Sequence, residues 1–71
     1  MRWECRYSSS EMLYLEVTKR DVISYFHHSP ERPERWRFED VLAGKHDAEV
    51  RNLFGDAAVE ELKAAVRTRT E

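Results

Sequence analysis

The stretch Met12-Leu13-Tyr14-Leu15-Glu16-Val17 decides the fold, because it is the densest apolar run in the chain. It mixes aliphatic, aromatic and β-branched residues, a composition typical of β-strands. In a strand, Leu13, Leu15 and Val17 share one wholly aliphatic face. The opposite face ends in Glu16 and is only half polar. The run therefore predicts a central strand over 12–17 that packs one of its two faces on the core.

The segment before this run predicts its first partner strand. Residues 2–7 alternate between two faces, as a half-buried strand does. Charged residues occupy one face, and the other face carries Trp3, Cys5 and Tyr7. The polar segment 8–11 has the length of a hairpin connection. We therefore expect an antiparallel hairpin whose charged face points to solvent.

Residues 18–28 admit two interpretations. In the first, Lys19-Arg20-Asp21 forms a turn and 22–27 forms a third strand. In the second, Thr18 caps the N-terminus of a short helix. Val, Ile, Tyr and Phe favour strands, and the β-branched pair weakens a helix. The sequence therefore favours a three-stranded meander.

The second half of the chain predicts helices after a break. Two prolines in the segment 29–35 restrict the backbone and lack amide hydrogens, which indicates a connection between a sheet part and a helical part. We expect helices over 34–43, 47–54 and 56–67. Gly44 and Gly55 stand where the first two of these helices end. Alternation over 35–39 keeps a strand open as the alternative to the first helix.

These elements predict a single α+β domain over residues 1–71. An N-terminal antiparallel β-meander of two or three strands packs against two or three C-terminal α-helices. The helices on either side of Gly55 form an αα-hairpin that covers the aliphatic face of 12–17. The residues expected in the core are Trp3, Tyr7, Leu13, Leu15, Val17, Ile23, Val41, Leu42, Val50, Leu53, Phe54, Val59, Leu62 and Val66.

Composition narrows the class of protein. Charged residues make up 37% of the chain, but the signs nearly cancel at a net charge of −2, which disfavours binding to nucleic acid through bulk charge. Cys5 is the single cysteine, so no internal disulfide forms. The apolar runs are far shorter than the roughly 20 residues of a membrane helix. With charges at the N-terminus where a signal peptide is apolar, we expect a cytoplasmic protein.

The spacing of reactive residues forms no constellation for catalysis or metal binding. His27 and His28 are adjacent and point to opposite faces of a strand, so they do not chelate one ion. Cys5 alternates with aromatic residues and is expected to be buried rather than nucleophilic. The carboxylate pairs Glu39-Asp40 and Glu60-Glu61 diverge on a helix. We therefore expect a protein that is no enzyme and that binds no metal or cofactor.

The segment Arg32-Pro33-Glu34-Arg35-Trp36-Arg37-Phe38 is the strongest candidate for partner binding. Tryptophan and arginine are enriched in protein-binding hot spots, and the same residues stack on bases and pair with phosphates. Interspersed glutamates disfavour nucleic acid, because phosphate binding requires unopposed positive charge. In a third interpretation, Trp36 closes the small core and the segment binds nothing.

The sequence thus predicts a small non-catalytic protein-binding module of the adaptor or inhibitor type. Its partner is expected to be another protein or a second copy of the chain, and not a membrane. The alternative function is binding of RNA or single-stranded DNA through an Arg/Trp/Tyr surface. Tyr14 is a candidate because the helices are too few to cover both faces of 12–17. The candidate partner-binding residues are Tyr14, Tyr25, Arg32, Arg35, Trp36 and Arg37.

Overall fold

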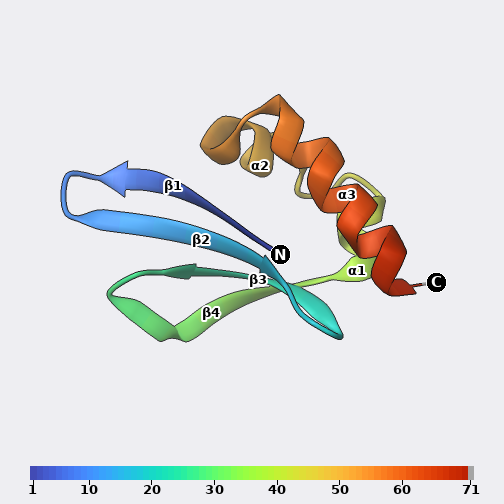
Figure 1. Cartoon of the computed structure of the whole chain (residues 1–71), viewed down its shortest axis with the longest axis horizontal. Helices are drawn as coiled ribbons and strands as arrows, with labels where there is room; N and C mark the ends of the chain where they lie inside the picture. Colours follow the sequence, from blue (N-terminus) through green and yellow to red (C-terminus); the bar gives the residue numbers. More distant parts are fainter. Residues whose placement is uncertain (71) are drawn as a thin grey trace.

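The fold is an antiparallel meander followed by helices. The computed structural model describes residues 1–70 and contains the strands β1 (Arg2–Ser8), β2 (Glu11–Val17), β3 (Asp21–Phe26) and β4 (Ser29–Arg37), and the helices α1 (Phe38–Leu42), α2 (Asp47–Phe54) and α3 (Asp56–Thr70). The strands form one sheet in the order β1-β2-β3-β4, and the helices gather on one side of it (Figure 1). The α+β class is confirmed, with four strands rather than two or three.

The β1–β2 hairpin has the faces that the alternation predicts. Trp3 lies opposite Leu15, and Cys5 lies opposite Leu13, so these four residues share the face that meets the helices. Leu13 and Leu15 are buried, and Trp3 packs against the edge of the core. On the other face Arg2 lies opposite Glu16. The apolar period of two therefore sets both the strands and their register.

The segment after β2 is a hairpin turn and a strand, as the first interpretation of residues 18–28 predicts. The amide of Thr18 donates to the carbonyl oxygen of Asp21 at 2.8 Å. The Thr18 hydroxyl donates to a carboxylate oxygen of Asp21 at 2.7 Å and accepts from the Asp21 amide at 3.0 Å. Thr18 therefore closes a β-turn with its side chain instead of capping a helix.

The prediction of a helix over 34–43 is wrong for its first four residues. Residues 34–37 belong to β4, and α1 begins only at Phe38. The interpretation of 29–35 as a break is also wrong, because Pro30 and Pro33 lie within β4. This strand is at the edge of the sheet, where a residue without an amide hydrogen breaks no ladder with a further strand. The alternation seen over 35–39 is a real strand pattern as far as Arg37.

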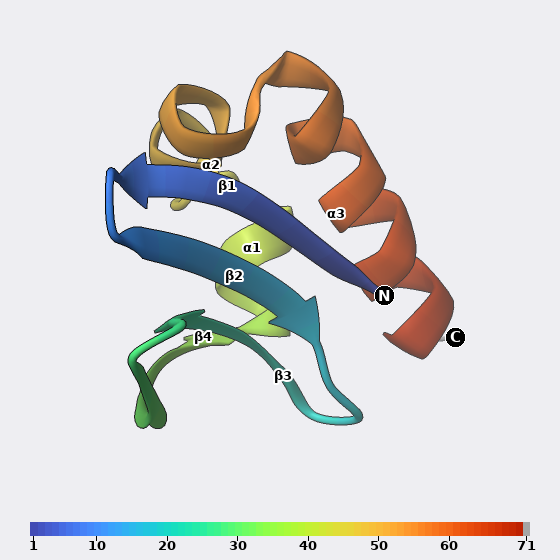
Figure 2. The same ribbon diagram turned by 60° about the vertical axis from the view of Figure 1, so that its left-hand side comes forward.

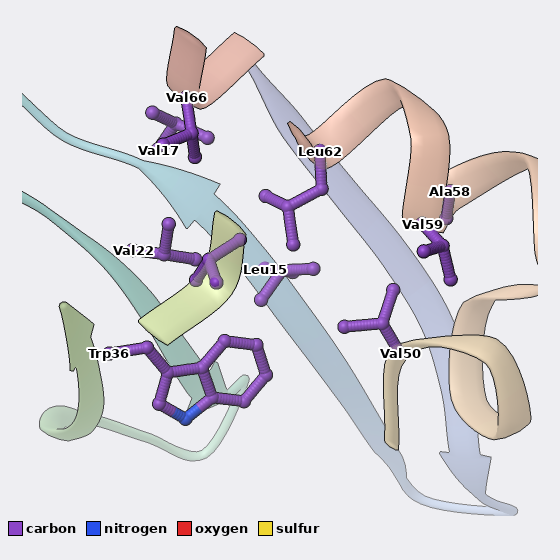
Figure 3. Packing of buried hydrophobic residues seen from close by; sticks show 10 residues of the cluster. Leu15, Val17, Val22, Trp36, Val50, Ala58, Val59, Leu62 and Val66 are labelled. Atoms are coloured by element: carbon purple, nitrogen blue, oxygen red, sulfur yellow. The ribbon is translucent and has the colours of Figure 1, made fainter. Parts of the chain in front are cut away.

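The core lies between the sheet and the helices, and its buried residues come from β2, β3, β4 and all three helices (Figure 3). Leu15 of β2 and Val22 of β3 are fully buried beneath the helices. The longest helix, α3, supplies a stripe at helical spacing. The buried residues of this cluster are Leu15, Val17, Val22, Trp36, Val41, Val50, Ala58, Val59, Leu62 and Val66.

Trp36 is part of this core. Its side chain is 3% exposed. The indole stacks on the ring of His46 with centroids 4.2 Å apart, and its N–H donates to Glu34 at 2.9 Å. Trp36 thus closes the core at the β4 edge, as the third interpretation of its segment proposes.

Three residues expected in the core lie outside it. Tyr7 is 56% exposed, because it stands near the end of β1 where its ring meets Phe26 edge-on rather than the helices. Ile23 is half-buried and faces the opposite side of the sheet from Val22. The prediction for Ile23 failed because Val22 and Ile23 are both apolar, and adjacent residues of a strand point to opposite faces. Leu53 is also only half-buried, whereas Leu42 and Phe54 pack against the cluster.

The two glycines mark where the first two helices end. Gly44 and Gly55 have φ angles of 87° and 99°, a left-handed backbone that side chains disfavour, and they lie after α1 and α2. The αα-hairpin of α2 and α3 around Gly55 is confirmed. Over the described part of the chain, no helix combines the length and the apolarity that crossing a bilayer requires.

Replacement of Leu15 by Asp is expected to abolish cooperative thermal unfolding, because a carboxylate at this fully buried position has no partner. Leu15→Ala leaves a cavity and is expected to lower the free energy of unfolding by about 2–5 kcal/mol. Ser9→Asp in the exposed β1–β2 turn is the control. Circular dichroism melts check the prediction, and a Leu15→Asp protein that melts like its parent would contradict the fold.

The Thr18–Asp21 contact predicts acid sensitivity. The hydrogen bond from Thr18 holds the pKa of Asp21 below its ordinary value of about 3.9; partial burial opposes this shift and Arg35 assists it. Because the pKa is lower in the folded state, Asp21 stabilises the fold above its unfolded-state pKa, and this contribution is lost as the pH falls through the folded-state pKa. Urea denaturation below about pH 5 is expected to show a smaller loss of stability in Asp21→Asn than in the parent. Equal losses in the two proteins would contradict the assignment.

Candidate functional site

The face of the sheet turned away from the helices is the candidate site, and we call it the open face. In Figure 2, β1 and β2 lie in front of the helices, so this face is toward the viewer. Within residues 1–70, no helix packs on it. By strand alternation and register its residues are Arg2, Glu4, Arg6, Met12, Tyr14, Glu16, Asp21, Ile23, Tyr25 and Arg35.

Two tyrosines form the centre of the open face. Tyr14 and Tyr25 lie directly opposite each other on β2 and β3, and their ring centroids are 5.3 Å apart. The guanidinium carbon of Arg2 lies 4.7 Å from the centroid of the Tyr14 ring, which is a cation–π geometry. The Tyr25 phenol donates to Glu16 at 3.1 Å. Both rings are half-buried and held in place by neighbours on the adjacent strands.

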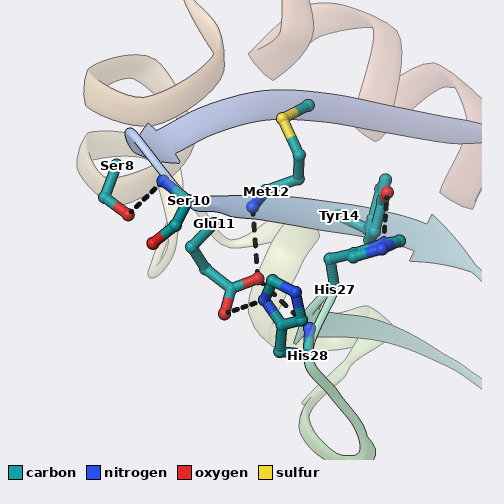
Figure 4. Close-up of polar contacts among 7 residues, drawn as sticks. All are labelled: Ser8, Ser10, Glu11, Met12, Tyr14, His27 and His28. Atoms are coloured by element: carbon teal, nitrogen blue, oxygen red, sulfur yellow. Dashed lines mark hydrogen bonds and ion pairs between the residues drawn. The ribbon is translucent and has the colours of Figure 1, made fainter.

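One end of the open face is held by contacts between the two hairpins (Figure 4). The Tyr14 hydroxyl and Nδ1 of His27 are 3.0 Å apart. Glu11 accepts from the amide of His28 at 3.2 Å, and its second oxygen lies 3.2 Å from Nδ1 of the same histidine. Partial burial opposes ionisation of Glu11, but the hydrogen bonds from His28 outweigh it and lower its pKa. The adjacent histidines thus bridge β2 to the β3–β4 turn.

These contacts give the histidines a structural role. His27 and His28 approach each other edge-on with ring centroids 5.1 Å apart, and each binds a different residue of β2. Among residues 1–70, histidine, cysteine and carboxylate side chains do not gather in groups of three or more that suit a metal ion. The free Cys5 is half-buried on the helix side, and this burial raises the pKa of its thiol.

Charges of both signs surround the tyrosines. Arg35 pairs with Asp21 at 3.1 Å, and its guanidinium remains largely exposed. Arg2 and Arg6 alternate along β1 with Glu4, and all three are exposed. The open face therefore presents an aromatic and aliphatic centre with a mixed-charge rim, and it has no continuous basic strip.

The predicted partner-binding residues divide between the two sides of the sheet. Tyr14, Tyr25 and Arg35 come together on the open face. Arg37 lies opposite Asp21 at the end of β4, where it pairs with Glu39. Trp36 is buried on the helix side, so its surface is not accessible to a partner of the folded chain.

Arg32 lies on the helix side, away from the open face. It lines a pocket of about 340 Å³ together with Tyr7, Phe26 and Leu53. The sequence segment around Trp36 therefore does not form a single surface. Strand alternation through β4 separates its arginines, and a helical interpretation of the same residues hides that separation.

Sequence reasoning missed two members of the open face. Arg2 packs on Tyr14, although it was expected only to be a solvated charge. Ile23 was assigned to the core. The signal that identifies both is the register, since each pairs across the sheet with Glu16 from a neighbouring strand.

No protein-family model, no curated protein and no solved structure matches the chain.

The Tyr25–Glu16 contact predicts a measurable contribution to stability. Tyr25→Phe removes the donor of this hydrogen bond and is expected to lower the free energy of unfolding by about 0.5–1.5 kcal/mol. Tyr7→Phe is the matched control, because the Tyr7 phenol is exposed and has no hydrogen-bond partner among residues 1–70. Urea denaturation of the three proteins checks this, and an equal effect of the two substitutions would contradict it.

Proposed function

We propose that the chain is a small non-catalytic protein-binding module, of the adaptor or inhibitor type, that binds its partner with the open face. The observation that carries this proposal is the half-buried Tyr14–Tyr25 pair on a sheet face that the described helices leave bare. Aromatic residues and arginine are enriched at the centres of protein interfaces, and charged residues form their rims. The open face has this arrangement.

The tyrosines suit binding because their positions are already constrained. Arg2 packs on Tyr14, and Glu16 accepts a hydrogen bond from Tyr25. Side chains that are ordered before association lose little conformational entropy when a partner docks. A pre-ordered aromatic pair therefore supports tight contact over a small area.

The mixed charge of the open face favours a protein partner over RNA or single-stranded DNA. Phosphate recognition gains affinity from positive charge that no nearby acid neutralises. Here Glu4 and Glu16 lie between the arginines, and Arg35 is paired with Asp21. Nucleic-acid binding remains the alternative function, and it loses support because Trp36 is buried and Arg32 faces the other way.

Truncation of the tyrosines tests the proposal. A partner captured from the source cell is purified, and its dissociation constant is measured for the parent and for Tyr14→Ala and Tyr25→Ala. Each substitution is expected to weaken binding by about thirtyfold, the effect of losing a hot-spot residue. Arg32→Ala, on the opposite side of the sheet, is the control and is expected to bind as the parent does.

Two results would overturn this proposal. In the first, the tyrosine variants keep their circular dichroism spectra and bind the partner with the affinity of the parent. In the second, labelled single-stranded oligonucleotides bind at low salt and are released at high salt, and Arg2→Ala or Arg35→Ala abolishes this binding. That outcome would favour the nucleic-acid function.

A further inference from the structure

The free edge of β1 is a second surface that has backbone groups available to bind another strand. The amide of Val17 donates to the carbonyl of Met1 at 3.2 Å, so odd-numbered residues of β1 exchange hydrogen bonds with β2. The backbone groups of Arg2, Glu4 and Arg6 therefore point away from the sheet. β1 is an edge strand of the described sheet, and an unpaired edge is a template for another strand.

The two edges of the sheet differ in how they are protected. The β4 edge contains Pro30 and Pro33, which have no amide hydrogen to offer a further strand. The β1 strand contains no proline and pairs regularly with β2 from Arg2 to Arg6, and a β-bulge interrupts only its end, between Arg6 and Ser8. Pairing with another strand is therefore directed to β1.

We propose that two copies of the chain associate through β1, antiparallel, about a two-fold axis that passes through Cys5. Each copy contributes its four-stranded sheet, and the two sheets become continuous. A two-fold contact of this kind uses the same strand from both copies, so the strand must be complementary to itself. The contact uses the backbone edge of β1 and, of the open face, only the rim residues Glu4 and Arg6, and the proposal does not depend on what binds the tyrosines.

The hydrogen-bonding pattern limits the registers available. From Arg2 to Arg6 the outward groups belong to even-numbered residues, so an even residue must face an even residue of the second copy. A β-bulge follows Arg6, and Ser8 pairs with Glu11 of β2. The register centred on Cys5 places Glu4 opposite Arg6 and Cys5 opposite Cys5. A shift of two residues toward the N-terminus places Glu4 opposite Glu4, and the opposite shift places Arg6 opposite Arg6. Of these three registers, only the one centred on Cys5 brings opposite charges together.

The same register matches the side chains on the helix side. Trp3 of each copy lies across from Tyr7 of the other, an exposed tyrosine at the bulge that follows Arg6. Aromatic pairs directly across an antiparallel ladder are stabilising. The charged pairs lie on one face of β1 and the aromatic pairs on the other, so both faces of the strand contribute to one register.

A charge-swap cycle tests this register by sedimentation equilibrium between about 10 µM and about 1 mM. The parent is expected to show a monomer–dimer equilibrium. Glu4→Arg and Arg6→Glu each place two like-charge pairs across the axis and are expected to raise the dissociation constant about tenfold. The double variant Glu4→Arg/Arg6→Glu restores opposite pairs and is expected to return to within about threefold of the parent. Arg67→Glu, at an exposed position of α3 outside β1 and the open face, is the control that leaves the equilibrium unchanged.

Two outcomes of the cycle would overturn the proposal. One is a parent protein that stays monomeric over the whole concentration range. The other is a double variant that associates no better than the single variants although its circular dichroism spectrum matches that of the parent. Because Glu4 and Arg6 also belong to the rim of the open face, partner binding is measured separately, with the Tyr14→Ala and Tyr25→Ala variants.

Cys5 provides a second readout of the axis. The two Cys5 residues form a non-hydrogen-bonded pair with Cα atoms about 4.5 Å apart, a separation that a disulfide spans. Copper–phenanthroline with dissolved oxygen removes two electrons and two protons from the paired thiols and joins their sulfur atoms. A covalent dimer on a non-reducing gel is expected for the parent and is expected to be reduced for Glu4→Arg. A parent that dimerises without this cross-link would overturn the register.

Discussion

The constraint on which the structure depends is that a single layer of helices covers one face of the sheet. The chain of 71 residues commits about two fifths of its length to strands and a similar share to α1, α2 and α3. Leu15, at the centre of the sheet, is fully buried because α3 and α1 lie over it. Within residues 1–70 no helix packs on the opposite face, where apolar groups are shielded through contacts between neighbouring strands.

This constraint explains why the open face is built from pairs. Tyr14 is packed by Arg2 from one neighbouring strand and by Tyr25 from the other. The aliphatic part of an arginine and the faces of two tyrosines reduce each other's contact with water while their polar ends stay solvated. A face of this kind is stable in a monomer and still offers a large aromatic surface to a partner. Stability of the free chain and capacity for binding therefore do not conflict.

The sequence predicts most of the fold because most of its signals are local. Period-two alternation identified β1 and β2, and the glycines marked the ends of α1 and α2. The failure at β4 has a specific cause. Pro30 and Pro33 disfavour both helix and central strand, and only the position of β4 at an edge makes them acceptable. Edge position is a property of the whole sheet, so no window of the sequence contains it.

The candidate site was predictable only in part for the same reason. Residues adjacent in the sequence around Trp36 looked like one surface, but the strand places Trp36 in the core and Arg35 on the open face. Tyr14, Tyr25 and Arg2 are distant in the sequence and meet through pairing. A binding surface on a sheet is assembled from alternate residues of several strands, and its composition follows from register rather than from any continuous motif.

The strand order has a consequence for synthesis on the ribosome. In the order β1-β2-β3-β4 every strand pairs with its neighbour in sequence, so the sheet needs only short loop closures to form. All four strands leave the ribosome before α3, which supplies four of the buried residues. Until α3 arrives, the aliphatic face of the nascent sheet is exposed to water. The nascent chain therefore passes through a stage in which it stays soluble only if aggregation is slow or a chaperone binds it. The prolines of β4 protect one edge of the sheet throughout this stage.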